Sequence, residues 1–183
     1  MKQVLFFILL ISFLNSTEAL EIPTEFRIKN ESPGYCTWVS IETIGRVHKI
    51  QSVENLFENR KKEKDVVFFI NGEKNTHKRN LGYDYAIKNK LNHLKVKYIL
   101  QYDDNLDKTL FKKYAKSSGC IFKVKKGASL NNNIYHSLIM TDYNEESIDF
   151  YDCNAPVKNW TAKKEWLDYY WTGWVLVILK EEP

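Results

Sequence analysis

The sequence lacks several features that define other classes of protein. Beyond Leu14 it has no apolar run approaching the roughly 20 residues of a membrane-spanning helix. It has no repeat, low-complexity block or evident linker, which argues for a single domain. Its 27 Lys and Arg residues are interrupted by acidic and aromatic residues, and no arginine cluster or nucleic-acid-binding motif is present. We therefore expect one globular domain and no nucleic-acid partner.

Histidine pairs at metal-ligand spacing are also absent. The four histidines are His48, His77, His93 and His136, and none of them forms the short His-x-His or His-x3-His spacing of a zinc site. The sequence therefore predicts no metal site, and nothing in it indicates a cofactor.

The N-terminal segment has the pattern of a secretory signal peptide. Lys2 precedes an apolar run from Val4 to Leu14, and Thr17 and Ala19 form a small-residue cleavage pattern. We expect residues 1–19 to be removed, which leaves residues 20–183 as a single domain that is secreted or periplasmic, without an integral membrane segment. The alternative is an uncleaved N-terminal anchor.

Cysteine is scarce, with only Cys36, Cys120 and Cys153 in the chain. In an oxidising compartment an odd number leaves at least one thiol free or paired between molecules. Cys120 and Cys153 could pair, and Cys36 would then remain free, as a nucleophile must be.

Cys36 stands between a Pro-Gly turn and a run in which Trp38, Ile41 and Ile44 recur at helical spacing. The spacing predicts a helix from Cys36 to about His48. A thiol at the start of a helix ionises more readily, because the helix dipole favours the thiolate. Cys36 is therefore a candidate nucleophile, and the alternative is a buried structural cysteine.

The remaining pattern predicts an α+β fold, with helices first and a mostly antiparallel sheet after them. Ser52 is expected to cap the second helix, and Asp107 and Gly119 to bound the fourth. Further helices are predicted over residues 52–64, 83–95, 106–119 and 161–171. Strands are predicted over residues 96–102, 120–124, 135–143, 147–152 and 173–179, and residues 65–72 are consistent with a strand and turn or with a buried loop.

His136 is the one histidine predicted at the start of a strand, directly after the Asn-rich loop 129–133. The next strand turns back beside it and ends in Asp152 and Asn154, either of which could orient the imidazole. Strand pairing does not choose between them. A carboxylate stabilises an imidazolium more than an amide does, so we favour Asp152 and keep Asn154 as the second candidate. The alternative is that "DCNAP" is only a turn.

The order Cys36, His136, Asp152 or Asn154 resembles the papain-like cysteine peptidases. "IKNESPGYCTW" is similar to the segment around the papain nucleophile, where an amide six residues before the cysteine completes the oxyanion hole. That position is Asn30 here, although the usual residue is Gln. "DCNAP" and "KKEWLDYYWTGWVLVIL" resemble the small bacterial peptidases related to double-glycine leader peptidases.

The resemblance implies a papain-like fold with N-terminal helices packed on the sheet, and a peptidase whose partner is a peptide or protein substrate; with the predicted signal peptide, we expect a secreted peptidase. It implies Cys36 as nucleophile, His136 as proton shuttle and Asn30 as oxyanion donor. It also implies that Cys120 and Cys153 lie at opposite ends of their strands, which disfavours a disulfide. Two other functions stay open: an amidase or acyltransferase acting on cell-wall peptides, and an inactive interaction domain on the same fold. The oligomeric state is not predicted.

Overall fold

The computed structural model describes residues 18–31, 34–63, 66–70, 73–77, 84–103, 105, 107–125, 135–157 and 159–180. Residues 1–17 of the predicted signal peptide and the Asn-rich loop 129–133 lie outside these ranges. No helix in the described ranges is both long and apolar enough to span a membrane.

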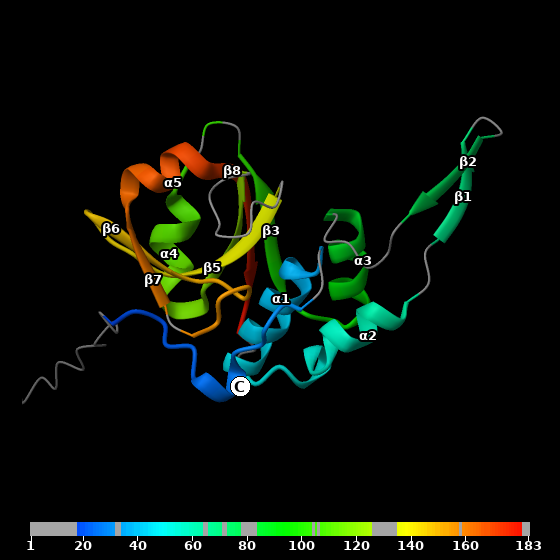
Figure 1. Cartoon of the computed structure of the whole chain (residues 1–183), viewed down its shortest axis with the longest axis horizontal. Coiled ribbons are helices and arrows are strands. Elements are labelled where there is room, and N and C mark those ends of the chain that lie inside the picture. The colour runs from blue at the N-terminus through cyan, green and yellow to red at the C-terminus, as the bar shows by residue number, and fades with distance from the viewer. Residues whose placement is uncertain are drawn as a thin grey trace, which may run out of the picture.

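A six-stranded antiparallel sheet forms the centre of the described structure (Figure 1). Its strands lie in the order β3-β8-β4-β5-β6-β7, so the last long strand of the chain, β8, inserts between β3 and β4. The strands are β3 (Tyr98–Tyr102), β4 (Cys120–Lys125), β5 (Tyr135–Tyr143), β6 (Ser147–Tyr151), β7 (Asn159–Lys163) and β8 (Trp171–Ile178).

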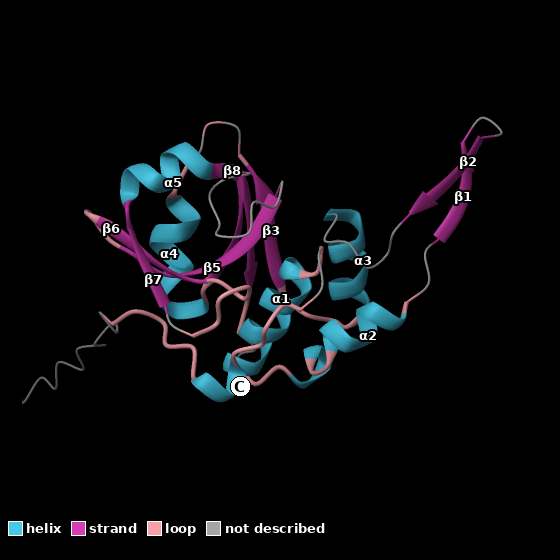
Figure 2. Cartoon of the chain, in the orientation of Figure 1, coloured by secondary structure: helices cyan, strands magenta, loops and turns pink. Residues whose placement is uncertain are grey.

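Helices cover both faces of this sheet (Figure 2). One face packs against α1 (Cys36–Val47) and the other against α4 (Thr109–Ser118) and α5 (Lys164–Tyr170). Successive residues of a strand point to opposite faces, so Ile121 of β4 joins the core around α1 while Phe122 joins the core around α4. Because both faces are buried, the central strands read as nearly continuous apolar runs.

Two further helices and a hairpin follow α1 on its side of the sheet. These are α2 (Leu56–Lys62), α3 (Asp84–His93) and the antiparallel pair β1 (Val66–Ile70) and β2 (Glu73–His77). Figure 1 shows the hairpin extending away from the sheet. His77, which lies outside the helices and strands predicted from the sequence, is the last residue of β2.

The predicted α+β architecture, with N-terminal helices packed on an antiparallel sheet, is confirmed. Two local predictions are wrong. The helix predicted from Thr161 begins at Lys164, because residues 159–163 pair with β6 as an edge strand. Ser52 does not cap α2, which begins at Leu56. Its cap comes from the buried Glu42 of α1, whose carboxylate accepts the N–H groups of Asn55 and Phe57 at 3.2 and 2.8 Å.

Candidate active site

Cys36 is the first residue of α1, and its side chain is almost fully buried. Trp38, Ile41 and Ile44 of the same helix are completely buried, which fixes the helix against the sheet. The first N–H groups of a helix have no acceptor within the helix, and they point past its first residue. The thiol of Cys36 therefore lies where the helix dipole favours a negative charge.

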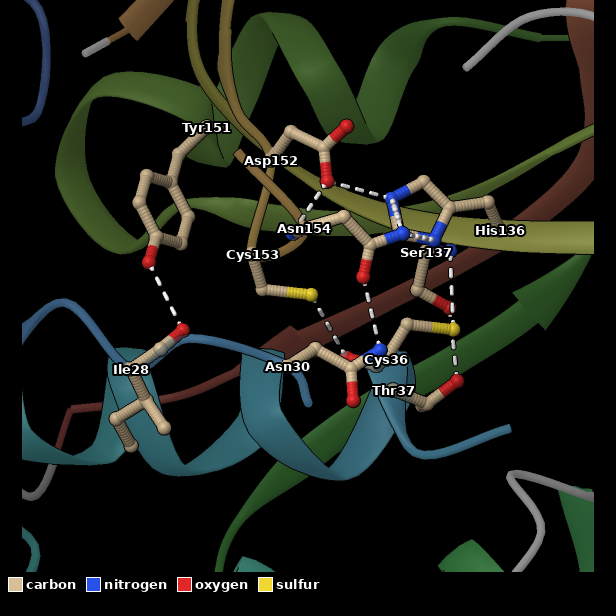
Figure 3. Close-up of polar contacts among 10 residues, drawn as sticks. All are labelled: Ile28, Asn30, Cys36, Thr37, His136, Ser137, Tyr151, Asp152, Cys153 and Asn154. Atoms are coloured by element: carbon tan, nitrogen blue, oxygen red, sulfur yellow. Dashed lines mark hydrogen bonds and ion pairs between the residues drawn. The ribbon is translucent and has the colours of Figure 1, made fainter. Parts of the chain in front are cut away.

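Strand β5 brings His136 and Ser137 to this helix end (Figure 3). The backbone N–H of Ser137 donates to Sγ of Cys36 at 3.4 Å, and the hydroxyl groups of Ser137 and Thr37 are 2.7 Å apart. These two contacts tie the start of the helix to the start of the strand. The thiol and the imidazole of His136 are thus held by two rigid elements that lie 100 residues apart in the sequence.

Asp152 follows β6 directly and lies beside the imidazole (Figure 3). Its Oδ1 is 2.6 Å from Nε2 of His136 and accepts the backbone N–H of Asn154 at 2.8 Å. Asn154 also reaches the ring, but its Nδ2 is 3.4 Å from each ring nitrogen. The shorter and better directed contact belongs to Asp152, and it leaves Nδ1 of His136 as the nitrogen that can serve Cys36.

Burial and pairing have opposite effects on the charges of Cys36 and His136. Burial raises the pKa of Cys36, but the hydrogen bond and positive charge of His136, with further bonds from Ser137, bring that pKa below its ordinary value. Burial lowers the pKa of His136, but hydrogen bonds to Asp152 and Cys36 and their negative charges raise it to about 9. Both shifts therefore favour the thiolate–imidazolium form of the pair.

Asn30 lies on the segment before α1 and joins the same cluster. Its backbone N–H donates to the carbonyl of Cys153 at 2.8 Å, and its Nδ2 donates to Oδ1 of Asn154 at 2.9 Å. The structure thus brings all five predicted site residues together. The contact with Asn154 orients the Asn30 amide, while its predicted role as an oxyanion donor remains a prediction.

The other two cysteines are fully buried, and all three thiols are free. Cys120 belongs to the core around α4 and Cys153 to the core around α1, so the sheet separates them. Burial raises the pKa of both thiols well above that of an ordinary cysteine. Neither thiol has the imidazole contact that Cys36 has.

Among the described residues, one group of potential metal ligands lies within 4.8 Å, namely His136, Asp152 and Cys153. Two properties make it a poor metal site. Nε2 of His136 is already bound to Asp152, and the raised pKa of Cys153 keeps that thiol protonated, whereas metals bind the thiolate.

Thr37 and Ser137 were not predicted from the sequence as site residues, and neither were the other residues that line the hollow beside Cys36. That hollow, of about 660 Å³, includes Asp84, Lys123 and Trp174. Thr37 directly follows the predicted nucleophile, and Ser137 directly follows the predicted histidine. These neighbouring positions were the sequence signal that could have identified both residues. No spacing in the sequence connects Asp84 with Trp174, because their contact depends on the order of the strands.

The fold is papain-like, with a thiol, an imidazole and a carboxylate together where α1 meets the sheet. Among solved structures the chain is similar to a double glycine motif protease from an AMS/PCAT transporter, determined in complex with the leader peptide. The TM-score is 0.52 and the identity 11%, over 90% of this chain and 96% of that one. Models of protein families and the curated proteins give no match.

Proposed function

We propose that this protein is a secreted cysteine peptidase that hydrolyses peptide bonds with Cys36 as nucleophile, His136 as acid and base, and Asp152 as the group that orients His136. The observation that carries the proposal is the connected series of contacts from Cys36 through the imidazole of His136 to Asp152, with 2.6 Å between Nε2 and the carboxylate.

The reaction follows from these contacts. The Cys36 thiolate attacks the peptide carbonyl carbon, and the imidazolium of His136 gives its proton to the departing amine. The resulting thioester is then hydrolysed by water: neutral His136 accepts one water proton, the carboxylic acid leaves, and Cys36 is released as the thiolate beside the His136 imidazolium. The backbone N–H of Cys36 and the amide of Asn30 are proposed to stabilise the negative oxygen that forms in each step.

Two other observations support the substrate class and the location. The structurally similar protease was determined with a leader peptide, which supports a peptide as the substrate here. The charge and apolar pattern of residues 1–19 supports secretion.

Deleting single thiols tests the proposal. Cys36→Ala should abolish hydrolysis of a peptide library without changing the melting temperature, because Cys36 supplies chemistry and little core volume. Cys120→Ala is the matched control, since it removes a thiol that is buried on the other face of the sheet, and it should keep its activity. Undiminished turnover by Cys36→Ala would refute the peptidase function.

A further inference from the structure

The hollow beside Cys36 has a chemical character that the proposed reaction does not require. Its volume of about 660 Å³ is much larger than the space a glycine would fill. Aromatic rings, including those of Tyr135 and Trp174, form part of its wall. Lys123 and Lys125, two positions apart on β4, line the same hollow, so both lie on one face of that strand.

One carboxylate organises this wall. Oδ1 of Asp84, the first residue of α3, accepts the indole N–H of Trp174 at 2.6 Å and lies 3.5 Å from Nζ of Lys123. The ammonium group of Lys123 also lies 4.0 Å from the centre of the Trp174 ring. Among the described residues that line the hollow, two lysines therefore face one carboxylate side chain.

Lys123 is largely buried and lies close enough to Cys36 for their charges to interact. Burial lowers the pKa of Lys123 below its ordinary value, and the carboxylate of Asp84 and the negative charge of Cys36 offset only part of this effect. In the strand register Lys123 is opposite Ser137, the residue whose N–H contacts the thiol. A ligand in the hollow would therefore lie next to the reacting sulfur.

We propose that this hollow is a substrate subsite that selects an acidic side chain close to the scissile bond, with its carboxylate paired to Lys123 and Lys125 and its methylene groups against Tyr135 and Trp174. This inference rests on the proposed peptidase function. A basic side chain would be repelled by both ammonium groups, and glycine would leave the space between the rings and the ammonium groups unfilled.

Peptides that differ at one position test the subsite by binding and by cleavage. A fluorescent peptide series carries Glu, Gln, Lys or Gly at each position around the cleavage site. Binding is measured by anisotropy with Cys36→Ala, which cannot turn the peptides over, and cleavage is measured with the wild type. We expect Glu to be preferred over Gln by roughly three- to tenfold, the range for partly exposed charged pairs, and the preference to weaken with salt.

Charge reversal supplies the decisive comparison. Lys125→Glu should remove the preference for Glu and improve the Lys peptide, and Lys123→Met should weaken the preference for Glu. Lys125 is exposed, so its variant should fold normally. Lys113→Glu makes the same change of net charge on α4, on the opposite side of the sheet, and should keep the wild-type preference.

Equal binding of the Glu and Gln peptides would overturn the subsite, and so would an unchanged preference for Glu in Lys125→Glu. Neither result affects peptide cleavage, so the peptidase proposal would remain intact. A preference for Glu in binding without any cleavage by the wild type would instead refute the peptidase function and support an acid-binding hollow. Failure of Cys36→Ala to bind any peptide that the wild type cleaves would also overturn the subsite.

Discussion

Replacing Asp152 with Asn changes the charge that stabilises the His136 imidazolium while conserving the size of the side chain. The two groups are buried and 2.6 Å apart, and a hydrogen bond to a charged group contributes about 1.5–3 kcal/mol. One pKa unit corresponds to about 1.4 kcal/mol. The pKa of His136, which Asp152 and Cys36 together raise to about 9, should therefore fall by about 1–2 units in Asp152→Asn.

The sign of the effect on activity follows from the role of His136. The imidazolium donates a proton to the departing amine, so kcat/KM should decline as the pH rises through the pKa of His136. In the wild type this decline should occur near pH 9, and in Asp152→Asn it should occur about 1–2 units lower. The assay is kcat/KM for a fluorogenic peptide from pH 5 to pH 10, together with the rate of iodoacetamide reaction at Cys36.

Asn154→Ala is the control, because Asn154 lies 3.4 Å from each ring nitrogen and carries no charge. It should shift the alkaline decline by less than Asp152→Asn does. If the decline of kcat/KM stays near pH 9 in Asp152→Asn and moves in Asn154→Ala, then Asn154, and not Asp152, controls the pKa of His136. Unchanged profiles in both variants would mean that His136 has no side-chain partner of this kind.

Three other variants test the oxyanion role and the framework of the site. Asn30→Ala should lower kcat by about 10²–10³ with little change in KM, as loss of an oxyanion donor does; wild-type kcat would place the donor elsewhere. Trp38→Ala should lower the free energy of unfolding by about 3–5 kcal/mol in urea titrations, because the ring is fully buried and lies under the guanidinium of Arg60 at 4.3 Å; a loss below about 1 kcal/mol would contradict this packing. Gly173→Ala should also destabilise the protein in that assay, because φ is +84° and an added Cβ would lie 2.3 Å from the carbonyl oxygen of Asp103; wild-type stability would contradict this contact.

The elements that hold the candidate nucleophile and histidine were predictable because their signals are local. The spacing of Trp38, Ile41 and Ile44 predicted α1 with Cys36 at its start, as found. The hairpin of β5 and β6 was predictable from two apolar runs around one short polar turn. Once a hairpin is known, the start of one strand and the end of the next must meet, which brought His136 close to Asp152 and Asn154.

Features that depend on distant parts of the chain could not be predicted in the same way. The cap of α2 comes from Glu42 in another helix, so local residues such as Ser52 gave the wrong boundary. An irregularity between Met140 and Asp142 shifts the register of β5 on β6, and β6 ends at Tyr151, so pairing alone did not identify the partner of His136.

The wall of the hollow is a second feature of this kind. Asp84 and Trp174 are 90 positions apart, and they meet because β8 inserts between β3 and β4. Local sequence patterns carry no information about that insertion. Residues 161–171 have a helix-like periodicity, but residues 159–163 form hydrogen bonds with the edge of β6 and so lie in a strand.

The central claim is that Cys36 is an activated thiol, and selective alkylation tests it most directly. The three thiols provide an internal comparison, because burial raises the pKa of Cys120 and Cys153 whereas His136 lowers that of Cys36. Native protein treated briefly with iodoacetamide at pH 6, then analysed by intact mass and peptide mapping, should carry one adduct on Cys36. His136→Ala should react much more slowly at that pH. Absence of an adduct on Cys36, or equal labelling of the three cysteines in folded protein, would contradict the account.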